Sequence, residues 1–247
     1  MEKFVVGIRF WEGRQENVET AIGKLRKTIE DMRSVGAEKI FVAVNTSEDL
    51  SDAPQWNWPE YAEVFGVEPW GFFVQPLNAI LIKARTELAQ GYGVLFASTG
   101  TSVSKEGIEI LLMNMDSNTI VVGATLEGHV YEAGIHNPAD GRQVPWNTLA
   151  LWNPKFLWSL GTPLIGDGPV DQPENKGVEE VCTIAVIQAI CPSAEAKLTL
   201  VPGQNWDTGW FDAERLAKHE KKMASKVSRP AAQLAEMGLK GPKVTHI

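Results

Sequence analysis

The sequence predicts an α/β protein in which a mixed, mainly parallel β-sheet lies between layers of helices, as a three-layer sandwich. Two observations predict this class. Short β-branched runs alternate along the chain with stretches whose apolar residues recur every three or four positions. The 247 residues are also 44% hydrophobic, which is enough for a substantial core. We expect one α/β domain over residues 1–210 and a helical C-terminal extension over residues 211–247.

The first half of the chain contains the clearest alternation. We expect a strand at 3–10, a helix at 18–32 that ends at Gly36, and a second, parallel strand at 39–44. Residues 51–70 hold three prolines and three tryptophans without periodicity, and this composition indicates a loop with a short helix. The remaining elements expected here are a strand at 72–75, a helix at 79–89 and a central strand at 92–97.

The second half is less regular. Ser104 is expected to cap a helix, and a strand follows at 119–124. The region 128–177 is rich in Gly, Pro, Asn and Trp. Within this region we expect strands at 129–131 and 147–152 and a helix at 154–160. After it we expect a helix at 179–190 and a strand at 197–201. The tail predicts a helix capped by Asp212 and a second one at 231–237. This tail packs either on the body or on another subunit, and the sequence leaves both open.

Composition excludes several classes of function. A net charge of −8 and a pI near 5.1 argue against a nucleic-acid binder, which needs basic surface to neutralise phosphates. We expect no signal peptide and no membrane span, because no apolar run approaches the roughly 18 residues that a span requires. The protein is therefore expected in the cytoplasm. Cys182 and Cys191 are expected to be reduced and buried.

The loop after the expected central strand is the first candidate site. Ser98, Thr99, Gly100 and Thr101 lie between that strand and the next helix, where α/β proteins usually bind ligands. Their hydroxyl groups and backbone N–H groups suit a phosphate. An ordinary turn with a helix cap explains the same residues.

The order of parts resembles the GT-A nucleotide-sugar glycosyltransferases, especially the large family-two type. Residues 8–12 (IRFWE), followed by Glu16 and Asn17, resemble the end of the family's first strand. Residues 44–49 (VNTSED) stand where the family has Asp-Asp-Gly-Ser-Thr-Asp, and residues 89–100 (AQGYGVLFASTG) resemble its Ala-x-Gly-x-Tyr-x-x-Phe-x-Asp-x-Asp element. Residues 145–161, 177–180 and 197–202 resemble the segment before the acceptor site, the Glu-Asp of the acceptor-side helix and the closing strand.

The resemblance implies a GT-A-like fold and sugar transfer, but the metal motif is missing. In the family the two carboxylates of Asp-x-Asp hold a divalent cation that helps the diphosphate to leave. Ser98 and Gly100 occupy those positions. Asn45 or Thr46 occupies the position of the acid that recognises the nucleotide base in the family. We therefore expect no divalent metal cofactor. The phosphates of the donor would instead meet hydroxyls, amides and a helix N-terminus.

The resemblance also implies roles for particular side chains. Glu180 would be the base that deprotonates the acceptor hydroxyl, and Glu179 would hold it or bind the acceptor. Both glutamates equally suit the first turn of a helix with no further role. Arg9 either binds a diphosphate or pairs with Glu12 or Glu16. The donor is expected near Arg9, Trp11, Asn45, Thr46 and residues 98–101.

Weaker candidates complete the set. Asp167 and Asp171 are alternatives to Glu180, and each of Trp11, Trp146 and Trp152 either stacks on a ligand or packs in the core. Glu127, His129 and His136 have the chemistry of metal ligands, but their spacing matches no zinc motif, so a surface role is favoured.

Three functions stay open at this level. The first is transfer of a sugar from a nucleotide-sugar donor to an unknown acceptor. The second is a catalytically inactive relative that binds a ligand or assembles through its C-terminal helices. The third is another nucleotide-dependent transferase, such as a nucleotidyltransferase.

Overall fold

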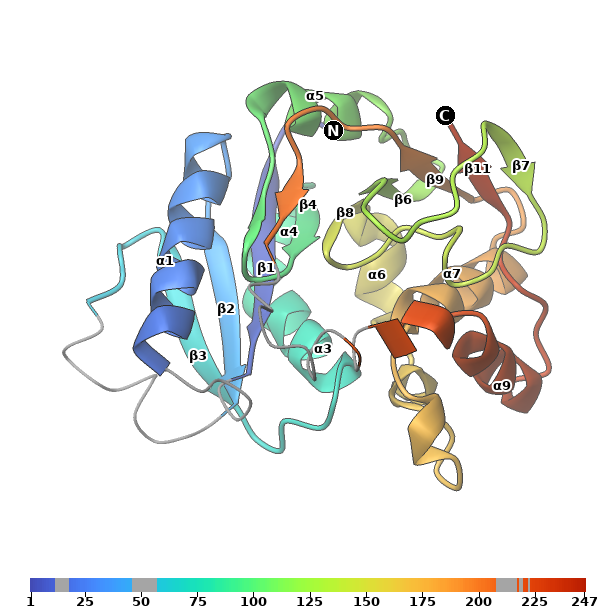
Figure 1. The fold of residues 1–247 in the computed structure, drawn as a ribbon. Helices are drawn as coiled ribbons and strands as arrows, with labels where there is room; N and C mark the ends of the chain where they lie inside the picture. Colours follow the sequence, from blue (N-terminus) through green and yellow to red (C-terminus); the bar gives the residue numbers. More distant parts are fainter. Residues whose placement is uncertain (12–17, 46–56, 208–216, 218–219, 222) are drawn as a thin grey trace.

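A nine-stranded mixed sheet forms the centre of the computed structural model, which describes residues 1–11, 18–45, 57–207, 217, 220–221 and 223–247 (Figure 1). The strand order is β3-β2-β1-β4-β8-β6-β9-β11-β7. The expected α/β class with a mixed, mainly parallel sheet is confirmed. The strands are β1 Phe4–Phe10, β2 Ile40–Asn45, β3 Ala62–Val67, β4 Gly93–Ala97, β6 Thr119–Ala124, β7 Gly134–His136, β8 Leu149–Trp152, β9 Glu195–Thr199 and β11 Val244–His246.

The antiparallel strand β8 joins two parallel blocks. β3, β2, β1 and β4 run parallel to one another, and so do β6, β9 and β11. β8 pairs antiparallel with both β4 and β6, and β7 pairs antiparallel with β11 at the edge. The inner strands are buried on both faces, which explains why their sequences are continuous apolar runs.

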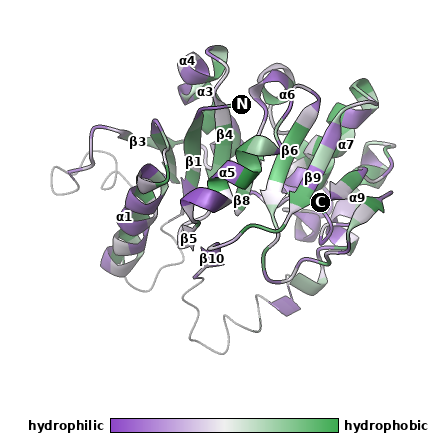
Figure 2. Ribbon diagram, turned by 90° about the horizontal axis from the view of Figure 1, so that it is seen from above, coloured by the Kyte–Doolittle hydropathy of each residue, from purple (hydrophilic) through white to green (hydrophobic). Residues whose placement is uncertain are grey.

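Helices cover both faces of the sheet, and the two sets have separate hydrophobic cores (Figure 2). Alternate residues of each strand enter opposite cores: Val5 packs with one and Val6 with the other. The helices of one face are α1 Val18–Ser34 and α5 Lys105–Met113. Those of the other are α3 Val74–Lys83, α4 Arg85–Ala89, α6 Pro154–Leu160, α7 Glu179–Ile190 and α9 Ser228–Glu236.

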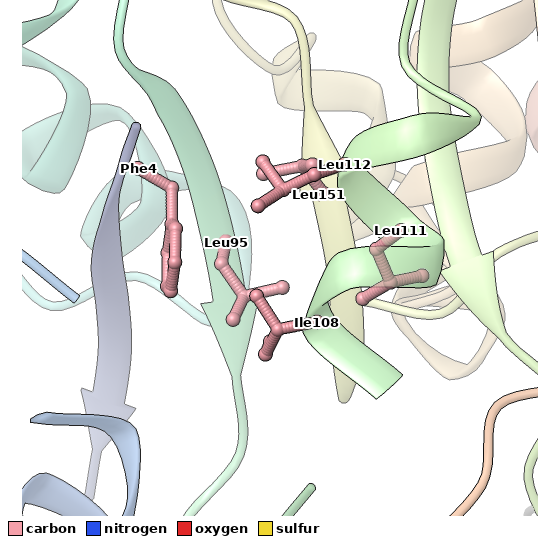
Figure 3. A pocket seen from close by; sticks show the side chains of 6 residues that line it. All are labelled: Phe4, Leu95, Ile108, Leu111, Leu112 and Leu151. Atoms are coloured by element: carbon pink, nitrogen blue, oxygen red, sulfur yellow. The ribbon is translucent and has the colours of Figure 1, made fainter. Parts of the chain in front are cut away.

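Close packing between α5 and the sheet leaves no room for a water molecule. Ile108 and Leu111 of α5 face Leu95 of β4 and Leu151 of β8 (Figure 3). The space between these side chains that a water molecule could occupy has a volume of about 0 Å³. The expected cap is present, because the Ser104 hydroxyl accepts a hydrogen bond from the N–H of Gly107 at 3.0 Å. This apolar contact therefore fixes the helix that follows the 98–101 loop.

Two predicted strands are wrong, and β3, β7 and β11 of the main sheet were not predicted. Residues 72–75 lead into α3, where the Asp167 carboxylate accepts hydrogen bonds from the N–H groups of Phe73 and Val74. Residues 129–131 form a loop, and the edge strand is β7. β3 lies in a segment that we expected to be a loop. Its pairing with β2 stabilises a sequence whose local signals are dominated by the flanking prolines.

The C-terminal tail belongs to the main sheet and is not only a helical extension. α9 packs on α7, and the chain then returns as β11 between β9 and β7. The expected cap of the first tail helix, Asp212, lies outside the described residues. Cys182 is free and buried as expected, but Cys191 is exposed because it lies just past the end of α7.

None of the helices in the described ranges combines the length and the apolar character that crossing a bilayer requires.

Candidate functional site

The candidate site lies at the carboxyl ends of β1 and β4. These strands are neighbours, but the chain leaves β1 toward β2 on one side and leaves β4 toward the other half of the sheet. Such a change of direction opens a crevice above the sheet edge, and ligands of open α/β sheets usually bind there. Arg9 near the end of β1 and Ser98 directly after β4 both line this crevice.

The crevice contains two chambers that share a wall. The wide chamber has a volume of about 440 Å³, and the narrow chamber has a volume of about 240 Å³. Arg9, Phe73 and Ser98 line both. The wide chamber is otherwise lined by Trp11, Trp70, Gly71, Phe72 and Lys176. The narrow chamber is otherwise lined by Trp146, Thr148, Gly177, Val178, Glu179, Glu180, Trp206, Met223, Lys226 and Arg229.

An ion pair connects Arg9 of β1 with Glu179 at the start of α7. The Arg9 Nη1 lies 2.7 Å from Glu179 Oε1 and also donates to the carbonyl oxygen of Phe73 at 2.9 Å. The Nδ2 of Asn147 donates to the same glutamate oxygen at 3.2 Å. Arg9 is therefore paired with a residue 170 positions away, whereas its alternative partners Glu12 and Glu16 lie outside the described residues.

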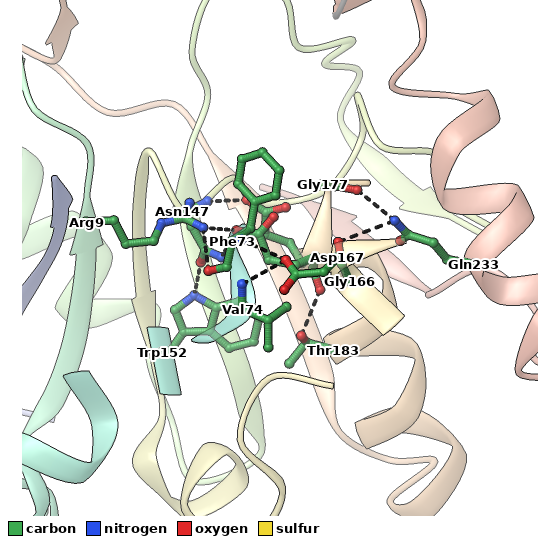
Figure 4. Close-up of polar contacts among 12 residues, drawn as sticks. Arg9, Phe73, Val74, Asn147, Trp152, Gly166, Asp167, Gly177, Thr183 and Gln233 are labelled. Carbon is green, nitrogen blue, oxygen red and sulfur yellow. Dashed lines mark hydrogen bonds and ion pairs between the residues drawn. The ribbon is translucent and has the colours of Figure 1, made fainter. Parts of the chain in front are cut away.

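Glu180 lies beside this pair and faces the narrow chamber. Its Oε1 accepts a hydrogen bond from the backbone N–H of Asn147 at 2.6 Å. The Asn147 side chain is itself held, because its oxygen accepts from Trp152 Nε1 at 2.9 Å (Figure 4). One asparagine thus orients both glutamates at the start of α7.

The two adjacent glutamates have opposite pKa shifts. The pKa of Glu180 is raised to about 7, because burial and the negative charge of Glu179 raise it more than the charge of Lys226 and the backbone hydrogen bonds lower it. Burial also acts to raise the pKa of Glu179, but the positive charge of Arg9 and the hydrogen bonds outweigh it and lower that pKa. Glu179 is therefore a fixed anion, and Glu180 exchanges a proton near neutral pH.

A strained turn places both glutamates. Val178 has φ 62° and ψ 39°, and it is the only non-glycine residue with positive φ in the described ranges. A β-branched residue rarely adopts this left-handed conformation, which costs about 1–2 kcal/mol. Gln233 of α9 holds the preceding segment by donating to the carbonyl oxygen of Gly177 at 2.9 Å (Figure 4). It also donates to the carbonyl oxygen of Asn175 at 2.6 Å.

In the loop 98–101, Ser98 lines the crevice, whereas Gly100 and Thr101 fix the loop against other segments. Ser98 lines both chambers. The Gly100 N–H donates to the Thr28 hydroxyl at 2.9 Å and its carbonyl accepts from the Asp207 N–H at 3.0 Å. Thr101 is buried and starts β5 Thr101–Ser102, which pairs with β10 Asn205–Trp206. Thr99 lines neither chamber, and its buried hydroxyl has no hydrogen-bond partner among the described residues.

Replacing Gly100 by alanine is expected to destabilise the protein by at least about 2 kcal/mol. Gly100 has φ 85°, and a Cβ there would collide with the backbone carbonyl oxygen of Asp207. Gly91→Ala is the matched control, because Gly91 has the same φ and nothing within 4 Å of its Cβ position. Denaturant unfolding of both variants measures the difference. Equal losses would mean that the contact with Asp207 does not constrain the loop.

The other residues expected to bind the sugar donor do not all lie at the crevice. Trp11 lines the wide chamber, and Asn45 ends β2 without lining either chamber. Thr46 lies outside the described residues. Trp146 lines the narrow chamber, whereas Trp152 is buried in the core and lines neither chamber.

Asp167 and His129 have structural partners, whereas Asp171 is exposed. Asp167 binds the first N–H groups of α3, and Asp171 lies exposed in the loop between η3 Leu164–Asp167 and η4 Pro173–Asn175. The ring nitrogens of His129 contact the backbone of Leu126 and Val144. Within the described ranges, no group of three or more His, Cys, Asp and Glu side chains is placed to hold a metal ion.

Three cations of the site were not predicted from the sequence. Lys176 lines the wide chamber, and Lys226 and Arg229 line the narrow one. The Arg229 Nη1 donates to the carbonyl oxygen of Lys176 at 2.6 Å, so the tail also supports the loop before α7. Local sequence patterns do not indicate these positions, because all three depend on how distant segments pack.

No family model matches the chain, and no curated protein sequence is significantly similar to it.

Proposed function

We propose that the protein transfers a sugar from a nucleotide-sugar donor to an acceptor hydroxyl, with Glu180 as the general base. The observation that carries the proposal is the pair of adjacent buried glutamates with opposite pKa shifts, facing a chamber at the carboxyl edge of the sheet. Carboxyl pairs whose surroundings separate their pKa values are typical of acid–base sites. A base with a pKa near the working pH is also the most effective one.

The wide chamber suits the donor. Trp11, Trp70 and Phe72 offer flat apolar surfaces on which a base or a sugar can stack. Among the described residues, Arg9 and Lys176 are its charged lining residues, and no acidic side chain of those residues lines it. A nucleoside diphosphate has both kinds of group, and the positive lining contrasts with a chain whose net charge is −8.

The narrow chamber suits the reacting hydroxyl. In the inverting form of the reaction, the acceptor oxygen forms a bond to the anomeric carbon and its proton passes to the Glu180 carboxylate. The bond between the anomeric carbon and the diphosphate breaks, and the nucleoside diphosphate leaves with the electron pair. Arg9, which lines both chambers, and Lys176 supply positive charge on the side of the leaving group.

The order of the parallel block and its junction with an antiparallel strand also supports the GT-A resemblance, which we retain as part of this proposal. A catalytically inactive, ligand-binding relative is the second candidate. The observation in its favour is that Gly100 and Thr101, two of the four residues in the expected phosphate loop, hold the loop through contacts with Thr28, Asp207 and Thr148.

Calorimetric titration with nucleoside diphosphates and their sugar conjugates, with and without Mn²⁺, tests the proposal. We expect binding that does not require Mn²⁺, together with slow hydrolysis of the bound donor. Lys176→Met is expected to weaken that binding about tenfold through the lost charge contact, and exposed Lys240→Met is the control. Binding without hydrolysis or transfer would favour the inactive relative. No binding of any nucleotide would overturn both.

A further inference from the structure

The end of the loop between β3 and α3 forms one side of the wide chamber, because residues 70–73 all line it. Asp167 holds this segment, since its carboxylate accepts hydrogen bonds from the N–H groups of Phe73 at 2.7 Å and Val74 at 3.0 Å. The Phe73 carbonyl oxygen accepts another from Arg9 Nη1 at 2.9 Å. The aromatic side of the chamber is therefore fixed by contacts within the protein, and such a preformed surface loses little freedom when a ligand binds.

The two phenylalanines of this segment each contact a cation of the chamber. Lys176 Nζ lies 3.9 Å from the centroid of the Phe72 ring, and Arg9 Cζ lies 5.6 Å from the centroid of the Phe73 ring. Phe72 is nevertheless 50% exposed. A large part of its apolar surface is therefore accessible to a ligand in the chamber.

The reaction determines which end of the donor lies near the wall that the two chambers share. This inference rests on the proposed function, in which Glu180 and the acceptor hydroxyl lie in the narrow chamber. The anomeric carbon must then lie beside the wall, where Arg9 and Ser98 line both chambers. In a nucleotide-sugar the diphosphate separates the sugar from the nucleoside. The nucleoside therefore lies farther from the wall than the sugar does.

We propose that Trp70 and Phe72 bind the base of the donor nucleotide by stacking, with the diphosphate between this aromatic surface and the wall. Both residues line the wide chamber and not the narrow one. An aromatic ring can stack on any base, because every base has a π face. The chamber volume of about 440 Å³ also lies within the range of about 300–1,000 Å³ that is usual for sites of small organic ligands.

This assignment moves recognition of the base to a different strand from the one that the family resemblance implies. The resemblance places the base near Asn45 or Thr46, after β2, whereas the aromatic surface follows β3. Asn45 lines neither chamber. The residue types at positions 70 and 72 thus favour a nucleotide over a sugar phosphate as the occupant of the wide chamber.

The affinity that a nucleoside adds to pyrophosphate tests this inference. Calorimetric titration of the full chain with pyrophosphate and with the diphosphates of adenosine, guanosine, uridine and cytidine, at constant ionic strength, measures this gain for each base. We expect at least one nucleoside diphosphate to bind at least about tenfold more tightly than pyrophosphate. Phe72→Leu keeps an apolar side chain at a half-exposed position, and it is expected to reduce the gain about tenfold while changing the affinity for pyrophosphate at most about twofold.

Three further variants complete the experiment. Trp70→Leu is expected to reduce the gain in the same way, with thermal unfolding as the check that it folds. Lys176→Met is expected to weaken binding of pyrophosphate and of the nucleoside diphosphates alike, which leaves the gain unchanged. Trp158→Leu is the matched control, because Trp158 is 56% exposed on α6 and lines neither chamber.

The outcomes separate this inference from the proposed function. An unchanged gain in both Phe72→Leu and Trp70→Leu, or no gain in the wild type, would overturn the inference alone. Equal losses of pyrophosphate and nucleoside diphosphate affinity in Phe72→Leu would also overturn it, since the loop would then only support the chamber. A gain that Phe72→Leu removes, in a protein that transfers no sugar, would support the inference and contradict the proposed function. No binding of any of these ligands would overturn both.

Discussion

Glu180→Gln is expected to reduce transfer by a factor of about 10²–10⁴ while leaving nucleotide binding unchanged. The amide cannot take a proton from the acceptor, but its oxygen can still accept the hydrogen bond from the Asn147 N–H. In the wild-type protein, kcat/KM is expected to rise with pH up to about 7 and to level off above it, because Glu180 must be ionised to act as a base. Initial rates across this pH range measure both effects.

The same variant has an expected signature in stability. The pKa of Glu180 is raised from 4.5 to about 7, so between these values the folded protein retains a proton that the unfolded chain releases. Its contribution is fully present below about pH 4.5 and is lost as the pH rises through about 7. Glu180→Gln removes this loss and should be more stable than the wild type at pH 8, by on the order of 2 kcal/mol.

Exposed Glu174→Gln serves as the control for both measurements, because it also removes one carboxylate but lies outside the two chambers. Normal transfer by Glu180→Gln would rule out the assigned base. If Glu180→Gln and the wild type differed in unfolding free energy by the same amount at pH 5 and at pH 8, the Glu180 carboxyl group would not titrate as its surroundings indicate.

Arg9→Met is expected to cost about 3–5 kcal/mol of unfolding free energy. The substitution leaves the Glu179 carboxylate buried without the cation that lies 2.7 Å away. Glu179→Gln in the same protein should recover much of the loss, because a neutral amide does not need the arginine. Urea unfolding of the two single variants and the double variant yields the coupling energy between these side chains.

Lys27→Met is the matched control for Arg9→Met. Lys27 also forms an ion pair at 2.7 Å, with Asp31, but its side chain is 73% exposed. Such a pair contributes only about 0.5 kcal/mol. A similarly small effect of Arg9→Met, or a double variant no more stable than Arg9→Met, would show that the buried pair does not stabilise the contact between β1 and α7.

Local patterns predicted much of the fold. The helix at α1, its neighbours β1 and β2, the buried strand β4 and the cap at Ser104 all followed from periodicity and capping chemistry. β3 and β11 were not predicted. Each is short, and each is stabilised by pairing with a strand from a different part of the sequence.

The candidate site was predicted only in part. Ser98 was singled out because it follows a predicted strand, and Glu179 and Glu180 were singled out because their segment resembles the Glu-Asp of the family's acceptor-side helix. That Arg9 pairs with Glu179, and not with a nearby acid, depends on strands that meet only in the folded sheet. That Gly100 helps to bind a phosphate stays a prediction. Its contact with Asp207 was not predicted from the sequence.

Local patterns in the chain predict the α/β class and the position of most strands and helices, and the family resemblance points to the two acids at the start of α7. Packing between distant segments gives these acids different pKa values, brings Ser98 to two chambers and lines one of them with cations from the tail. The physical reason is the range of the interactions. Periodicity and caps act over a few residues, whereas burial and electrostatic pairing depend on segments as far apart as Arg9 and Arg229.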